Sequence, residues 1–497
     1  MGYTRKTYQD FENARNQGEN AMLQFIKSAI SEHKSRNLYQ QAIDAELYDR
    51  GENVTIRMVQ KFLYNTSGQQ YVDIYAANNK IANNIFSHLI TQQNEYSLAN
   101  GVNFDNAEID EKIANINKNF DTQIKDIARY ALRDGRAYGY FDGRNINAFE
   151  YKEFVAFKDE NTGKLRAGVR FYQIDKDKPI NLWLYEEDGL THYRTLNLHG
   201  NDFETIEPKK SYITILKGTD ADGMIPVESK NYSSLPVYEL RANSYGQSEL
   251  NAIRDKIDAY DLTLSGLAND IDENAFIYWI IQNAGGMEDA DIARFKQALR
   301  TAKVAEIDAT DGSSVEQFQK DVPTEARTAM LDRLKQDIYE TYGAFNPAVL
   351  SAGNLTATQI NAAYTVVDNK ASQFEKQITE FVQNILLLME IQTEDYKIRY
   401  IRNRLVNAAE EAQTERTKIE TLLLLSNYLD DKTLIEAVKT IIPELSDIDV
   451  EELIKKKSLQ DDEGFGATGN EGDNRPAIEQ TEGNAPNGNE GNLNNEA

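Results

Sequence analysis

The chain has 497 residues, 40% of them hydrophobic, so it is long enough for several domains and can bury a core. Its formal net charge of −26 opposes a general electrostatic attraction to nucleic acid, and the absence of cysteine excludes disulfides and thiolate chemistry. No apolar run approaches the roughly 18 residues of a membrane span, the N-terminus lacks the apolar core of a signal peptide, and the four histidines are scattered, which argues against a histidine-based metal site.

Helical spacing dominates the first part of the chain. Residues 5–50 read as helical, and residues 54–64 as a further short helix or strand. An amphipathic helix is predicted from Ala76, with Ile81, Ile85, Leu89 and Tyr96 on one face and a stop near Asn100-Gly101. Two more helices are expected from about Asn106 and over 121–133, the second broken by Asp134-Gly135.

From Ala137 to Leu240 the apolar period changes from helical to two, which is typical of strands. The turn signals Asn161-Thr-Gly163, Asp188-Gly189 and His199-Gly-Asn201 separate the predicted strands. This stretch is therefore expected to form an antiparallel β region between helical ones.

Two rod-like helices follow, with an insert between them. In the first, residues 248–274, a heptad seam is expected to pack inward: Leu250, Ile253, Ile257, Tyr260, Leu264, Leu267 and Ile271. Its outward positions carry the acids Asp255, Asp258, Asp272 and Glu273. The second rod, residues 324–343, has the inner stripe Met330, Leu331, Leu334 and Ile338.

The insert, residues 275–323, is predicted to hold strands at 276–281, 304–307 and 315–318 and a short helix with Ile292, Phe295 and Leu299. So small a unit is not expected to be stable alone, so we expect it to pack against the same insert in other subunits.

The second rod leads into a loop of mostly small residues, 345–355. Thr356 and Gln359 then form a capping box for a helix of about 34 residues, with the stripe Ile360, Val367, Ala371, Phe374, Ile378, Phe381, Ile385 and Leu388. A short strand is predicted at 396–400, followed by helices at 414–429, 431–442 and 447–456. From Ser458 the chain is acidic and rich in Gly and Asn, a composition typical of disorder.

The chemical motifs are weak. Residues 218–223 have P-loop glycine spacing, but Met224 and Ile225 replace its Lys and Ser/Thr. Asp220 and Asp222 resemble the middle of a calcium loop, yet Gly218 and Ser229 occupy the first and twelfth ligand positions, so a surface turn is favoured. The acid pairs Asp270/Asp272 and Asp337/Glu340 fit a solvated helix face better than catalysis. The arginines at 399, 402 and 404 fit either phosphate contacts or a charged subunit rim.

Four stretches in a fixed order carry a resemblance to a known family. They are Asn78–Ile81 running to Leu98–Gly101; Asp134–Tyr138; Leu235–Glu239 with Asn243, Ser248–Leu250, Ile257–Tyr260, Ser265 and Asn269; and Tyr428–Leu434 with Pro443 and Asp447. Each stretch has low specificity by itself, but their order resembles that in the portal proteins of tailed bacteriophages, of the siphophage type. The resemblance covers most of residues 50–455.

The resemblance implies an α+β, mostly α portal fold. A wing would contain residues 1–247 (helices plus antiparallel β) and 357–400, with a two-helix stem (248–274 and 324–343), a small α/β clip (275–323), a helical crown (401–457) and a disordered acidic tail (458–497). The tunnel loop (344–356) would include Asn346, Pro347, Ala348, Val349, Leu350, Ser351, Ala352, Gly353 and Asn354.

It also implies a non-enzymatic ring, usually of twelve subunits, at one capsid vertex of the virion, assembled in the host cytoplasm. Double-stranded DNA would pass through it, with the terminase, the major capsid and scaffolding proteins, and a head-completion or adaptor protein as partners. No cofactor, metal or membrane is implied. Two alternatives remain: an enzyme such as a nuclease using the acid clusters, and a heptad-based oligomeric adaptor without a DNA channel.

The acids Asp255, Asp258, Asp272 and Glu273 are candidates for the lumen of such a stem, where an acidic wall would not hold DNA by counterion release. Alternatively, they only keep the outside of the stem soluble.

Overall fold

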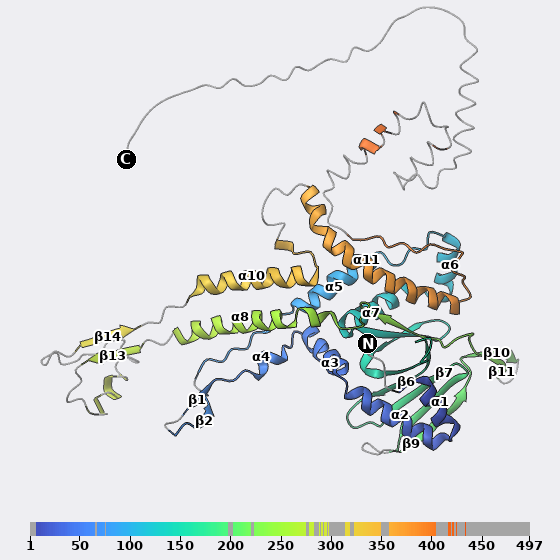
Figure 1. Ribbon diagram of the computed structural model, residues 1–497, viewed down its shortest axis with the longest axis horizontal. Helices are drawn as coiled ribbons and strands as arrows, with labels where there is room; N and C mark the ends of the chain where they lie inside the picture. The colour runs from blue at the N-terminus through green and yellow to red at the C-terminus, as the bar shows by residue number, and fades with distance from the viewer. Residues whose placement is uncertain are drawn as a thin grey trace, which may run out of the picture. The chain divides into compact units, whose positions relative to one another are not determined.

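Helices precede and follow an antiparallel β region in this chain, as Figure 1 shows. The computed structural model describes residues 6–64, 67–74, 76–196, 202–219, 223–274, 278–282, 314–318, 323–348 and 357–403, with isolated positions in 288–297 and 416–433. The chain divides into two units, residues 1–405 and 406–497, and the fold described here is that of the first. The predicted helices at 414–456 and the acidic tail lie almost wholly outside the described residues.

A five-stranded meander is the largest sheet. Its strands are β5 (Phe154–Lys158), β6 (Leu165–Gln173), β7 (Ile180–Glu186), β8 (Gly189–Thr195) and β9 (Phe203–Lys210), each antiparallel to the next. A three-stranded sheet has the order β12 (Val237–Arg241), β3 (Arg136–Phe141) and β4 (Ile146–Glu150). The strands β10 (Ile213–Thr219) and β11 (Gly223–Lys230) pair as a hairpin. The predicted antiparallel β region is confirmed.

Alternating residues of the meander face two cores. In β5, Val155 and Phe157 pack with the helices α1 (Tyr8–Asn16) and α2 (Glu19–Lys34), while Phe154 and Ala156 belong to a second cluster. The second cluster includes Tyr138 and Phe149 from the three-stranded sheet and Ala42 from α3 (Asn37–Asp49), with the 3-10 turn η1 (Tyr151–Glu153) beside it. Both faces of β5 are therefore covered, as its almost continuous apolar run requires.

The main core gathers helices from distant parts of the sequence. It is built by α5 (Ile85–Leu98), α6 (Ala107–Ile116), α7 (Phe120–Asp134), α11 (Ala357–Leu388), β3 and β4. The paired helices α8 (Arg254–Asn274) and α10 (Thr324–Tyr342) also contribute: α8 by its start, with the 3-10 turn η2 (Glu249–Ala252) before it, and α10 by its last turns. Phe374, Ile378, Phe381 and Ile385 of the predicted α11 stripe are buried in it.

The helix expected from Ala76 begins only at Ile85, so that prediction is wrong for residues 76–84. This segment contains four asparagines, whose side chains compete for backbone hydrogen bonds and lower the propensity for helix. The residues predicted as a short helix or strand form both: α4 (Val54–Met58), and then β1 (Phe62–Tyr64) paired with β2 (Gln70–Val72). In the insert, β13 (Tyr278–Gln282) pairs with β14 (Ser314–Phe318), close to two of the predicted strands, and the predicted strand 304–307 lies outside the described residues.

At the C-terminal side of the unit, α11 ends at Leu388, and the predicted strand at 396–400 is only an isolated bridge between Asn103 and Arg399. Met330 and Ile271, expected on inner stripes, are 49% and 54% exposed. A heptad pattern identifies the apolar side of each rod, but one copy of the chain does not bury that side along its whole length.

His33 gives the fold a dependence on pH. Its ring is 2% exposed, and Nε2 lies 3.0 Å from the backbone oxygen of Tyr151. Burial, with smaller contributions from Arg36 and Lys34, lowers its pKa from 6.5 to about 4. The folded state therefore keeps this ring neutral while the unfolded state takes up a proton below about pH 6.5.

The wild-type protein should lose about 2 kcal/mol of unfolding free energy from this group between pH 7 and pH 5, because only the unfolded ring is then protonated. In a His33→Gln variant this part of the pH dependence should be absent. Urea unfolding at both pH values measures it, and His88→Gln, at an exposed position, serves as the matched control. If all three proteins lost the same unfolding free energy between pH 7 and pH 5, His33 would not be the source of this pH dependence.

Candidate functional site

The paired helices α8 and α10 run antiparallel, side by side (Figure 1). Near the core, the ammonium group of Lys256 donates to the backbone oxygen of Asp337 (3.4 Å) and to Thr341. Farther out, Arg327 forms an ion pair with Asp270. Gly266 leaves room for this arginine, since a Cβ there would lie 2.8 Å from Nη1 of Arg327. The two contacts fix the register of the pair.

Burial along α8 decreases away from the core. Ile253 and Ile257 are 0% and 1% exposed, Tyr260, Leu264 and Leu267 are half-buried, and Ile271 is exposed. On α10, Leu331, Leu334 and Ile338 are buried, while Met330 is exposed. The distal half of the pair therefore presents apolar side chains that the described residues of this copy do not cover.

Three buried polar side chains of α8 bind the extended chain that precedes α5. Asp261, Ser265 and Asn269, the α8 ladder, accept hydrogen bonds from the backbone N–H groups of Asn83 (3.2 Å), Ile81 (2.9 Å) and Asn79 (2.6 Å). Four helical residues rise about 6 Å and two extended residues span about 6.6 Å, so the two spacings match at each step. Sequence reasoning missed the ladder, although polar residues at i, i+4 and i+8 beside an apolar seam were its signal.

Two of the proposed lumen acids are engaged by the same N-terminal segment. Asp258 accepts hydrogen bonds from Asn53 (2.9 Å), Thr55 (2.8 Å) and the hydroxyl of Tyr48, and Asp272 accepts one from Asn79. Asp255 is exposed, with no ion pair to any described residue, and the side chain of Glu273 lies outside the described part. Asp255 and Asp272 are exposed, whereas Asp258 is partly buried among its three donors.

Asp258→Lys should destabilise the protein by about 2–3 kcal/mol, because three donors lose a charged acceptor. The same change at Asp255, on the same helix, should alter stability by less than about 1 kcal/mol, mostly through the helix dipole. Denaturant unfolding of the two variants compares them directly. Equal losses would mean that the Asp258 contacts contribute nothing to stability.

The base of α8 is held by a tight crossing with the end of α7. Gly135 ends α7 in the left-handed region (φ 90°), and a Cβ there would lie 2.5 Å from the carbonyl carbon of Gln247. Ser248 caps η2 by accepting from the N–H of Leu250 (3.1 Å), and its hydroxyl donates to the backbone oxygen of Arg133 (2.5 Å). The first rod therefore starts directly against the last turn of α7.

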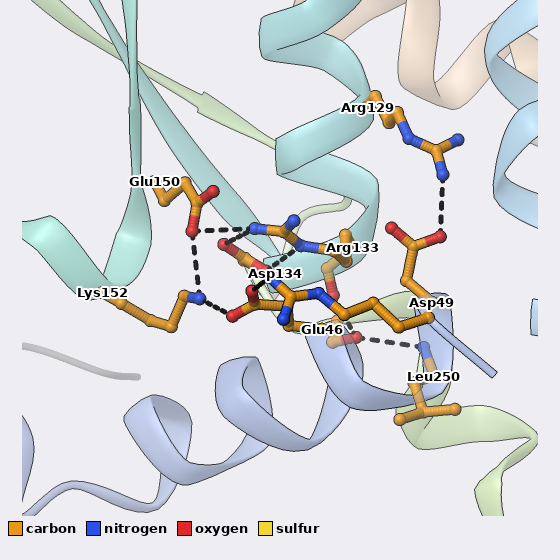
Figure 2. A network of polar contacts seen from close by, with 10 residues as sticks. Glu46, Asp49, Arg129, Arg133, Asp134, Glu150, Lys152 and Leu250 are labelled. Atoms are coloured by element: carbon orange, nitrogen blue, oxygen red, sulfur yellow. Dashed lines mark hydrogen bonds and ion pairs between the residues drawn. The ribbon is translucent and has the colours of Figure 1, made fainter. Parts of the chain in front are cut away.

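A network of charged side chains surrounds this base (Figure 2). The guanidinium of Arg133 donates to both oxygens of buried Asp134 (2.7 and 3.0 Å) and pairs with Glu150 (3.0 Å). Lys152 joins Glu150 (3.0 Å) to Glu46 of α3. Burial raises the pKa of Asp134 to about 6, although the Arg133 guanidinium opposes the shift. The network links α3, α7 and β4 at the point where the paired helices begin.

Comparison with known proteins identifies the family of this chain. The family model described as Phage portal protein, SPP1 Gp6-like, matches residues 33–441. The chain belongs to this phage portal family. It is 24% identical over 355 residues to a portal protein of Clostridium phage phiCD119, covering 68% of this chain and 77% of that protein. A chain from the neck of the native GTA particle, computed with C12 symmetry, aligns with a TM-score of 0.42 and 10% identity, covering 72% of this chain and 89% of that chain.

The family resemblance drawn from the sequence is thus confirmed, and the function is that of a phage portal protein. Among the described residues no group of three or more His, Cys, Asp or Glu side chains is placed to hold a metal ion. None of the described helices combines the length and the hydropathy that a membrane span needs. Residues 218–223 were considered above as a phosphate or calcium loop. Of these, 218 and 219 end β10, 223 begins β11, and 220–222 lie outside the described residues.

The loop predicted to be a tunnel loop is anchored at its start. Phe345 is buried and stacks on Tyr364 of α11 (ring centroids 4.7 Å apart), and its backbone N–H and oxygen bond the side chain of Gln92 (3.1 and 2.9 Å). Pro347 and Ala348 are exposed, and Asn346 is partly buried. Val349, Leu350, Ser351, Ala352, Gly353 and Asn354 lie outside the described residues. The anchor fixes where the loop leaves the core.

The arginines and acids weighed as chemical groups are paired within the chain. Arg402 binds Glu375 (2.7 Å) and Asp368 (3.0 Å) of α11, and Arg399 binds Asp105 (2.8 Å). Asp270 pairs with Arg327, and Asp337 pairs with Arg333 (3.0 Å). Arg404 lies outside the described residues. These pairs fit a structural role better than phosphate binding or catalysis.

Proposed function

We propose that copies of this chain close into a ring, with twelve as the expected number, at one vertex of a phage capsid. Double-stranded DNA passes through the ring during packaging and ejection. The terminase motor, the head-completion or adaptor protein, and the capsid and scaffolding proteins bind around it. The chain acts as a structural component of the virion, assembled in the host cytoplasm, and not as an enzyme.

In this proposal α8 and α10 form the stem (248–274 and 324–343), and the insert 275–323 is the clip. Residues 1–247 and 357–400 form the wing, 344–356 the tunnel loop, 401–457 the crown and 458–497 an acidic tail. Asp255, Asp272 and Glu273 are the lumen candidates, and Asp258 joins them only if its contacts with Tyr48, Asn53 and Thr55 open in the ring.

One observation carries the proposal: the apolar side of the paired helices is covered near the core and uncovered at the distal end, where Ile271 and Met330 are exposed. Exposed apolar patches of this kind mark interaction surfaces. A closed ring of identical subunits covers such a surface on every copy at once. The two-stranded β13–β14 pair, too small to be stable alone, gains neighbours in the same arrangement.

Purified full-length protein should form one closed species many times heavier than the 56.4 kDa chain. Mass photometry gives its mass, and negative-stain images show whether it is a ring with a central channel. Salt should be varied, because repulsion between chains of net charge −26 weakens assembly at low ionic strength. A stable monomer or dimer at every salt concentration contradicts the proposal.

A further inference from the structure

A short arm of the chain carries apolar side chains that nothing in the described structure covers. We define the arm as residues 53–83, of which 65, 66 and 75 are not described. Its hairpin pairs Phe62 with Val72, Leu63 with Tyr71 and Tyr64 with Gln70, and all six residues are exposed. Beside it, Met58 and Ile74 are 74% and 77% exposed.

Both faces of the hairpin are apolar. Phe62, Tyr64 and Val72 share one face, and Leu63 and Tyr71 share the other, because side chains alternate along a strand. A two-stranded hairpin is marginally stable in water by itself, and its free edges invite pairing with other chains. A hairpin with two apolar faces therefore needs a surface to pack against.

The arm is held in a fixed place. The α8 ladder binds its C-terminal stretch, and Asn53 and Thr55 at its N-terminal end donate to Asp261 (2.8 Å) and Asp258 (2.8 Å). The ammonium group of Lys80 donates to the backbone oxygen of Arg57 (2.6 Å) and ties the two ends together. Both ends of the arm are thus bound to α8 while its apolar hairpin is left uncovered.

The arm and α10 contact different faces of α8. Ladder residues Asp261, Ser265 and Asn269 bind the arm, whereas Gly266 and Asp270 lie against Arg327 of α10. At about 100° per residue, the centres of these two faces lie about a third of a turn apart. One copy therefore carries the arm and the exposed surface of α10 at separate places, as a head-to-tail interface requires.

We infer that the arm of one subunit docks on the distal half of the α8–α10 pair of a second copy. Exposed Ile271 and Met330 supply apolar surface there. The charges are complementary in sum, because the arm carries three cations (Arg57, Lys61, Lys80) and one carboxylate (Asp73). The distal half, residues 264–274 and 324–333, carries five carboxylates and two cations: Asp270, Asp272, Glu273, Glu325 and Asp332 against Arg327 and Arg333. The inference rests on the proposed ring and names one of its contacts.

The first test compares two variants of the full-length chain. Phe62→Thr/Tyr64→Thr/Val72→Thr removes one apolar face and keeps residues that favour strands. The control Ile174→Thr/Tyr245→Thr removes exposed apolar residues far from the arm in sequence. The arm variant should stay folded by circular dichroism and need at least a tenfold higher concentration for half-assembly by mass photometry, while the control assembles as the wild type does.

The second test uses the absence of cysteine from the chain. Val72→Cys, on the face tested above, combined with Met330→Cys should, after mild oxidation of assembled protein, give covalent multimers in steps of one chain, and neither single variant should. If the arm variant fails to fold, this cross-linking measurement still tests whether the arm contacts α10 of a second copy.

Arm variants that assemble as the wild type does, or assembled double-cysteine protein that yields no covalent multimer, would overturn the inference and leave the ring intact. An arm variant that assembles normally but no longer joins capsids would mean that the arm meets another component. A wild-type chain that never assembles would instead defeat the proposed function itself.

Discussion

Gly135→Ala is expected to destabilise the protein by at least about 3 kcal/mol and to abolish assembly. The residue has φ 90°, a region that costs an L-residue about 1 kcal/mol. The added Cβ would also lie 2.5 Å from the carbonyl carbon of Gln247 and 2.6 Å from the nitrogen of Ser248. Both are backbone atoms, so the base of α8 must shift and the Ser248 cap must weaken.

Gly163→Ala is the matched control. Gly163 also has a positive φ (68°), but a Cβ there meets nothing within 4 Å. That variant should lose only about 1 kcal/mol, the conformational part. Urea unfolding and mass photometry of both variants separate the clash from the backbone strain. Equal losses in the two variants would mean that the crossing at Gly135 tolerates a side chain.

The sequence predicts this crossing only in part. Asp134-Gly135 is a visible helix stop, and the change of period after Ala137 marks the β region correctly. That Gln247 and Ser248 return to within contact of Gly135 depends on β12 pairing with β3, a contact between residues about a hundred positions apart. Local periodicity contains no information on such pairings.

The same limit explains the error at residues 76–84. Ile81 and Ile85 fit a helical stripe, but the backbone N–H groups of this segment find acceptors on α8, some 180 residues away. Likewise the heptad seam correctly identifies Ile253 and Ile257 as buried, but it does not predict that Ile271 on the same seam is exposed. A partner in another copy of the chain would restore the pattern, which is why the mismatch is informative.

The candidate site shows a similar division. The two rods and the start of the loop at Phe345 follow from apolar spacing and breakers. The hydrogen bonding of the acids cannot be predicted in this way. Asp255 and Asp258 have the same chemistry, and only Asp258 is reached by Tyr48, Asn53 and Thr55. The assignment of Asp255, Asp258, Asp272 and Glu273 to a lumen stays a prediction.

Arg133→Met should destabilise the protein by about 3–5 kcal/mol, because it leaves the fully buried carboxylate of Asp134 without its bidentate partner. Glu150 keeps Lys152 at 3.0 Å, so the loss centres on Asp134. Arg129→Met, one turn earlier on α7, removes a more exposed pair with Asp49 (2.7 Å) and should lose no more than about 1 kcal/mol. Unfolding of both variants in urea at pH 7.5 gives the comparison.

The pH dependence of the Arg133 variant identifies the cause of its loss. Burial already raises the pKa of Asp134 to about 6 against the opposing effect of Arg133, and removing the arginine raises it further. The buried carboxyl is then neutral in the folded state at pH 5 and is forced to ionise, or to stay protonated at a penalty, as the pH rises to 8. The deficit relative to wild type should therefore be smaller at pH 5 than at pH 8. Adding Asp134→Asn to the variant should remove that difference, because an amide carries no charge to bury. A deficit that is the same at both pH values would show that lost packing of the Arg133 side chain, and not the stranded carboxylate, weakens the base of the first rod.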